Sequence, residues 1–205
     1  MKHFEFTGVT KRQKGVTLHQ IRATRPIERI GIRVGEIGGF VEKEDNLKDN
    51  GWVYEKARVY GNAVVKGNAF ICGKARVYGN AVVDDYAVVM DNAKVYGDAI
   101  VYEQAIVRDN AEVFDNAKVY GEVSLYDNAK AYGNAKIYSD VVLEHDTEVF
   151  DNAEIFDKVR ISNNAKVYGK VKIHYKVNVK ENANICGDKE IKGEDYIEII
   201  EDINE

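Results

Sequence analysis

A six-residue unit repeats without interruption from Ala57 to Asp188, and its first copy spans Ala57–Asn62. Position one is Ala in 16 of the 22 hexads, and position three is Val, Ile or Leu in 21 of them. Gly, Asn and Asp dominate positions five and six. A fixed short period of this kind indicates a repeat architecture, in which each unit buries its apolar side against its neighbours.

The hexad predicts a short strand followed by a sharp corner. Apolar positions one and three flank a polar or variable position two, which is the alternation of a β-strand and not of a helix. Positions five and six carry residues that tolerate positive φ, as a corner requires. Small Ala and branched Val pointing inward suit a narrow interior.

Position four shows how many hexads make one turn, because it matches best at a spacing of 18 residues. Three distinct series follow this spacing, and they begin at Tyr60, Lys66 and Cys72. We therefore expect three hexads per coil and a three-walled column. Weaker hexads in residues 39–53 add one coil to the seven between 57 and 188, giving about eight coils and a length of about 40 Å.

These residues resemble the hexapeptide-repeat family, whose signature is an aliphatic residue, two or three turn residues and then a small residue. Val59–Ala63 follows that signature, as do most later units. The resemblance implies an all-β, left-handed parallel β-helix. Residues 35–54 also look like a bacterial and phage subgroup of this family, often labelled transferase on fold alone, and fold analogy is a weak basis for activity.

The chain divides into three parts. Residues 1–38 do not follow the hexad and predict an N-terminal β cap, with strands at His3–Thr7 and Val16–Thr24 before Pro26 turns the chain into Ile30–Val34. Residues 39–188 form the β-helix, and residues 189–205 a C-terminal cap strand and acidic tail, since unpaired strand edges at solenoid ends need covering.

An aromatic ladder is expected at one corner of the column. Two interpretations stay open: a stacking platform for a ligand, or rings that stabilise the column by stacking on one another. Its members are Tyr60, Tyr78, Tyr96, Phe114, Tyr132, Phe150 and Tyr168.

Apolar residues also occupy position two, which should face solvent, in the early coils. This predicts a covered surface, either beneath the N-terminal segment or against another subunit. Self-association as a trimer or dimer is slightly favoured, because the family commonly assembles through its faces. One face carries Trp52, Phe70, Val88 and Ile106, and the neighbouring face carries Val64, Val82 and Ile100, with Met90 near a corner.

Acyl transfer from coenzyme A is the activity that the resemblance implies most often, with a His as general base. The only His residues within the coils are His145 and His174, and the unbroken frame leaves no inserted loop beside them. We expect no metal site and no cofactor. Coenzyme A would be a cofactor only if the chain were an acyltransferase. Acidic corners leave a third alternative, an acidic mimic of nucleic acid.

Charge and cysteine usage bear on partners and location. Residues 1–38 carry a net charge of +5 and residues 187–205 a net charge of −6. Cys72 and Cys186 lie more than six coils apart, too far for a disulfide, which favours a reducing cytoplasm. No apolar run suggests a membrane segment, and no nucleic-acid-binding motif is present. The sequence thus favours a non-catalytic scaffold that binds a protein or itself, with a host protein as partner if the chain is phage-encoded.

Overall fold

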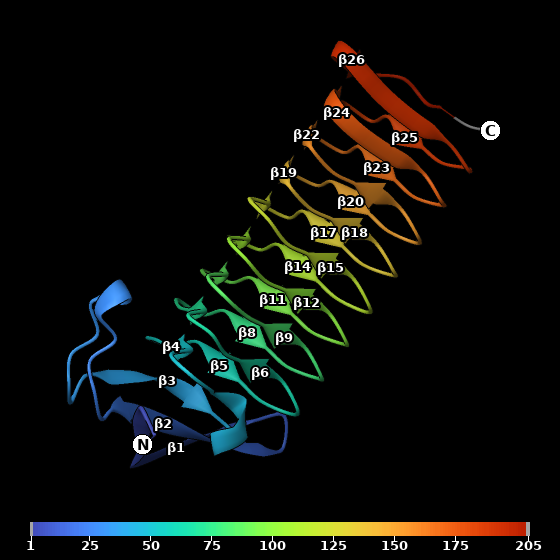
Figure 1. The fold of residues 1–205 in the computed structure, drawn as a ribbon. Coiled ribbons are helices and arrows are strands. Elements are labelled where there is room, and N and C mark those ends of the chain that lie inside the picture. The colour runs from blue at the N-terminus through green and yellow to red at the C-terminus, as the bar shows by residue number, and fades with distance from the viewer. Residues whose placement is uncertain (1, 204–205) are drawn as a thin grey trace.

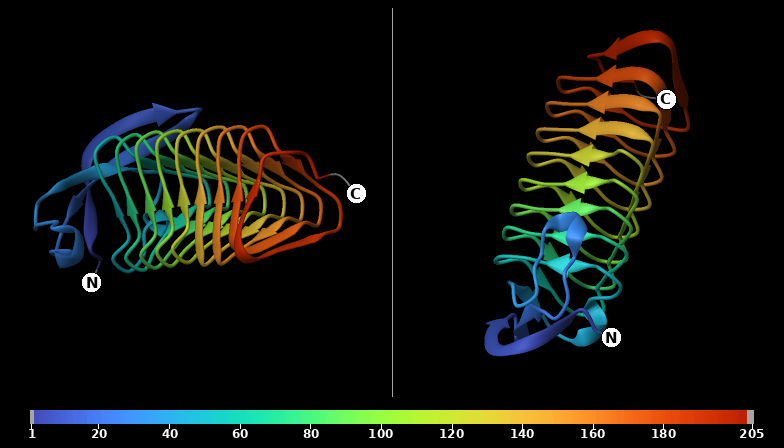
Figure 2. Two further views of the ribbon diagram at one scale, coloured as in Figure 1. Left: turned by 90° about the horizontal axis from the view of Figure 1, so that it is seen from above. Right: turned by 60° about the vertical axis from the view of Figure 1, so that its left-hand side comes forward.

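The computed structural model describes residues 2–203, with the side chains of 194–197 left aside. It shows a parallel β-solenoid of about nine turns (Figures 1 and 2). The all-β architecture with three hexads per coil is confirmed. The extra turn comes from residues 190–203, whose strand β26 (Glu190–Ile199) pairs in parallel with β24 (Lys172–Val179). The left-handed sense stays a prediction from the resemblance.

Each coil contributes a strand to each of three walls. The first wall stacks β3 (Ile37–Val41), β5 (Arg58–Val59), β8 (Arg76–Val77), β11 (Lys94–Val95), β14 (Glu112–Val113), β17 (Lys130–Ala131), β20 (Glu148–Val149), β23 (Lys166–Val167) and β25 (Asn184–Ile185). The second wall stacks β6 (Val64–Val65), β9 (Val82–Val83), β12 (Ile100–Val101), β15 (Lys118–Val119), β18 (Lys136–Ile137) and β21 (Glu154–Ile155). The third wall stacks β4 (Trp52–Val53), β7 (Phe70–Ile71), β10 (Val88–Val89), β13 (Ile106–Val107), β16 (Ser124–Leu125), β19 (Asp140–Leu143) and β22 (Lys158–Ile161). Strand β24 links the second and third walls at the C-terminal end.

Register follows the 18-residue spacing throughout the walls. Val59 pairs with Val77, and Val77 with Val95, and all three side chains are fully buried. Position one is equally buried, so Ala and aliphatic side chains fill the interior as predicted. Burying one such aliphatic side chain contributes about 1.5–3 kcal/mol relative to leaving it in water.

The corners are held by two kinds of hydrogen bond between successive coils. Position five has positive φ, at Asp109 (59°) and Asp127 (53°) for example, which lets the chain turn within one residue. The N–H of position six donates to the carbonyl of position five in the next coil, as Asn110 does to Asp127 at 2.7 Å. At many corners the position-five carboxylate accepts the N–H one coil later, as Asp109 Oδ2 does from Asp127 at 3.3 Å.

The N-terminal segment lies across the start of the solenoid (Figure 1). Strands β1 (Phe4–Gln13) and β2 (Val16–Ala23) form an antiparallel hairpin, and β2 pairs antiparallel with β3. Residues 30–34 form no strand; the chain instead makes a 3-10 turn, η1 (Glu28–Ile30), and a bridge between Ile27 and Ile32.

The start of the second wall is closed by a buried amide. Asn46, in the 3-10 turn η2 (Glu44–Asn46), donates its side-chain N–H groups to the carbonyls of Gly61 and Ala63 at 3.2 and 2.7 Å. Leu47 bridges Val65 beside it. The first carbonyls of this wall are therefore paired although no full strand precedes them.

Candidate functional site

The predicted apolar surface occupies the second and third walls in the early coils. Val88 pairs with Phe70 and with Ile106 along the third wall, so these side chains form one outward row. The row on the second wall contains Val64, Val82 and Ile100. All six are half-buried, as is Met90 at the corner after the third wall. We call the seven residues the apolar wall patch.

Trp52 does not belong to this patch. The sequence placed it on the outer face, but its side chain is fully buried. It shares a buried cluster with Ile21, Ile27 and Ile32 of the N-terminal segment, and its ring lies 6.3 Å from that of His3. The sequence placed Trp52 in an outward surface that must be covered, and residues 3–32 supply the cover by folding back over the start of the third wall.

Gly38 permits this close approach. A Cβ at this position would lie 2.6 Å from Ile21 Cγ1 and 2.9 Å from Trp52 Cζ2. The cover ends soon after, since Phe70 only packs at the edge of the cluster. Of the two covers that the sequence left open, the N-terminal segment and another subunit, it is the N-terminal segment that covers Trp52.

The corner between the second and third walls carries one strongly exposed aromatic side chain within this region. Tyr86 is 47% exposed, and the Arg29 guanidinium lies 4.4 Å from its ring centroid. Arg29 also donates to the carbonyl of Asn68 at 2.8 Å. Tyr86 thus lies at the corner between the two rows of the apolar wall patch, and Arg29 of the N-terminal segment packs on it there.

Later coils end the patch abruptly. Ile106 pairs with Ser124 on the third wall. On the second wall Ile100 pairs with Lys118, which in turn pairs with Lys136. Both lysine side chains are exposed. On the second wall, identical backbone positions therefore carry aliphatic groups in the early coils and charged groups in the later ones, whereas the third wall continues with Ser124 and Val142.

The predicted aromatic ladder exists as one continuous stack at the corner after the first wall. Successive ring centroids from Tyr60 to Tyr168 lie 4.8–5.1 Å apart, and neighbouring planes differ by 1–4°. Tyr96 Oη donates to Glu112 at 2.9 Å, and Tyr132 Oη donates to Glu148 at 2.7 Å. Burial, and then these hydrogen bonds, raise the pKa of both tyrosines. Because the ring faces cover one another, the stack leaves mainly ring edges for a ligand.

A second aromatic ladder, which the sequence interpretation did not name, stands at the corner after the second wall. Its ring centroids lie 4.6–5.0 Å apart. The signal was present in the 18-residue series that begins at Lys66. Its members are Tyr102, Tyr120, Tyr138, Phe156 and His174.

His174 ends this second ladder and is largely buried. Its ring stacks on Phe156 at 4.6 Å, and its Nε2 lies 2.8 Å from Glu190 Oε1. Its Nδ1 is buried without a hydrogen-bond partner and lies 3.9 Å from Asp157 Oδ2. The imidazole therefore contacts side chains of its own and neighbouring coils.

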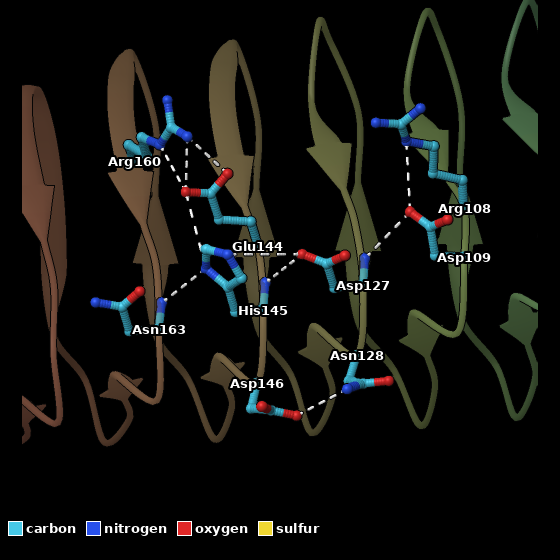
Figure 3. Close-up of polar contacts among 9 residues, drawn as sticks. All are labelled: Arg108, Asp109, Asp127, Asn128, Glu144, His145, Asp146, Arg160 and Asn163. Atoms are coloured by element: carbon cyan, nitrogen blue, oxygen red, sulfur yellow. Dashed lines mark hydrogen bonds and ion pairs between the residues drawn. The ribbon is translucent and has the colours of Figure 1, made fainter.

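His145 occupies a corner position that aspartates fill in the preceding coils (Figure 3). Its backbone N–H donates to Asp127 Oδ2 at 3.1 Å, and its Nδ1 accepts the N–H of Asn163 at 3.2 Å. The neighbouring Glu144 forms a bidentate pair with Arg160 at 2.7 Å. His145 thus continues the column of side-chain acceptors, with an imidazole nitrogen in place of a carboxylate oxygen.

The acidic corners have the same structural explanation. Asp91, Asp109 and Asp127 each accept a backbone N–H from the next coil, so their spacing serves the fold. Within residues 2–203 no group of three or more His, Cys, Asp or Glu side chains has the arrangement of a metal site. No helix of the described chain is both long and apolar enough to cross a membrane.

Comparison with known proteins agrees with the fold. A family model described as the YdcK beta solenoid repeat matches residues 57–73 and 69–85. The comparison with curated proteins finds no match. The match and the architecture together define the class, a repeat β-solenoid protein.

Proposed function

We propose that this protein is a non-catalytic scaffold whose apolar wall patch binds a protein partner. The observation that carries the proposal is the pair of in-register apolar rows on two adjacent walls, with exposed Tyr86 between them. Outward aliphatic groups on a flat wall gain free energy when a partner removes them from water, about 25 cal/mol per Å². An apolar centre with an aromatic anchor and a charged rim is the usual composition of a protein-binding surface.

The partner in this proposal is a bacterial host protein, and the location is the cytoplasm. Both parts rest on the resemblance of residues 35–54 to a bacterial and phage subgroup and on the cysteine usage of the chain. Self-association through the same walls is the competing alternative, and sedimentation velocity of V82K/I100K tests it separately from the capture experiment.

The test replaces Val82 and Ile100 by lysine. Lys118 and Lys136 occupy the same register on the same wall, so the fold accommodates lysine there. The variant V82K/I100K and a control that adds the same two positive charges at exposed corner residues, N116K/N152K, serve as baits in bacterial lysate, and captured proteins are identified by mass spectrometry. We expect a saturable partner that the wild type and the control retain and that V82K/I100K loses at least tenfold. Equal capture by all three baits would overturn the proposal.

Acetyl coenzyme A separates the scaffold from the acyltransferase alternative. Isothermal titration of the wild type is expected to show no saturable binding. Saturable binding that disappears in H145A or H174A would replace the scaffold by an enzyme.

A further inference from the structure

The two ends of the solenoid are edge strands of equal length. Strand β1 is the outermost strand of its sheet and pairs only with β2, and β26 at the other end pairs with β24. Each contains ten residues. Among residues 2–203 no strand pairs with the far side of either one, so both carry backbone N–H and C=O groups open to a further strand.

Both ends also expose large apolar side chains. On β1, Phe6 is 37% and Val9 is 52% exposed, and Ile200 just after β26 is 55% exposed. The residues of the apolar wall patch are less exposed and lie on the second and third walls. The ends are therefore a separate apolar surface. Exposed aliphatic groups beside an open sheet edge favour pairing with another chain.

The ends differ in the sign of their charge. Residues 1–38 have a net charge of +5 and residues 187–205 a net charge of −6, and Figure 1 places these segments at opposite ends of the rod. Lys11, Arg12 and Lys14 near the tip of the hairpin are exposed and make no ion pair within the described residues. Glu201 beside Ile200 is likewise exposed and unpaired there.

We propose that copies of this chain associate end to end, with the β1 end of one copy against the β26 end of the next. Head-to-head contact would bring two positive ends together, and tail-to-tail contact two negative ends, whereas head-to-tail contact pairs opposite charges. The two surfaces are different, so the contact is heterologous and generates an open row of rods instead of a closed dimer. This association uses the ends and is independent of the partner proposed for the wall patch.

Sedimentation velocity over a range of protein concentrations tests this proposal. We expect the weight-average sedimentation coefficient to rise with concentration without a plateau at about 0.05 M salt. It should fall toward the monomer value at about 1 M salt, where the Debye length shrinks to about 3 Å. A monomer at every concentration, or a salt-independent plateau at a dimer or trimer, would overturn the proposal.

Charge-reversal variants at each end give a second and more specific test in the same assay. R12E/K14E lowers the net charge of residues 1–38 from +5 to +1, and E198K/E201K changes the net charge of residues 187–205 from −6 to −2. Each variant alone is expected to associate at least tenfold more weakly than the wild type. An equimolar mixture should form two-chain complexes, because the basic hairpin of E198K/E201K meets the acidic C-terminal end of R12E/K14E.

Two controls accompany the charge-reversal variants. K118E/K136E changes the net charge by the same amount as R12E/K14E, but on the wall, and should associate like the wild type. Since Glu198 pairs with Lys180 at 2.7 Å, E201K alone is measured in parallel and should show a smaller loss in the same direction. Association that survives both end variants but disappears in V82K/I100K would assign self-association to the wall and refute end-to-end contact.

Discussion

Removal of one ring from the first aromatic ladder tests whether the stack stabilises the column. Phe114 lies between Tyr96 and Tyr132, at ring-centroid distances of 4.9 and 4.8 Å. An aromatic pair of this kind contributes about 0.5–1.5 kcal/mol beyond its buried area. F114A removes two such pairs, so we expect a loss of about 1–3 kcal/mol from stacking, and more from the lost burial.

A double-mutant cycle isolates one pair. We expect the losses in unfolding free energy of F114A and Y132A to be coupled by about 0.5–1.5 kcal/mol, because either single variant already removes the stack between Phe114 and Tyr132. F114A combined with F156A is the matched control. Phe156 belongs to the second ladder at another corner, so these changes should add within about 0.3–0.5 kcal/mol.

Urea unfolding followed by far-UV circular dichroism supplies the free energies of unfolding. Amide hydrogen exchange checks that the array unfolds as one unit, because repeat proteins can lose cooperativity. Coupling no larger than in the control cycle would refute the structural role of the stack. Unchanged stability with lost partner binding would make the ladder a binding platform instead.

Three further predictions concern single side chains. H145A should destabilise the protein by about 0.5–1.5 kcal/mol because the N–H of Asn163 loses its acceptor, whereas H145D should restore most of that loss in urea unfolding; equal stabilities would contradict the acceptor role. Burial lowers the pKa of His3, so the unfolded state binds more protons, and stability should be lost as pH falls below about 6.5. The fluorescence of Trp52, the single tryptophan, should report loosening of the hairpin between pH 7 and 5, and H3F should remove this pH dependence. Burial raises the pKa of the Cys72 thiol to about 11, so iodoacetamide should alkylate it far more slowly at pH 8 than it alkylates an exposed cysteine, and rapid alkylation would show that the site opens.

The walls of this protein could be derived from sequence because their determinants are local and periodic. A register error of one residue would move Val59 and its equivalents out of the interior, so the alternation of buried and outward positions specifies the pairing by itself. The 18-residue series likewise located the first ladder ring by ring. It contained the second ladder as well, although the lysine and aspartate that begin that series obscured it.

The roles of the histidines required the folded chain. His145 follows the same corner rule as Asp109 and Asp127, but an imidazole at a bend resembles a catalytic group until its acceptor contact with Asn163 is visible. His174 is buried by Phe156 from the preceding coil and contacts Glu190 in the last turn. Such contacts lie 16 to 18 residues away in sequence, and only stacking brings them together.

The repeat alone determined the cross-section of this protein, its register and the composition of its interior, because each hexad meets the same neighbours. The ends depended on tertiary structure, because residues 1–38 have no period and their partners are distant in sequence. Trp52 shows the difference: its position in the hexad predicts an outward side chain, and the hairpin packed across Gly38 buries it. Periodicity describes the contacts between like units, and it carries no information about a segment that packs on them from outside.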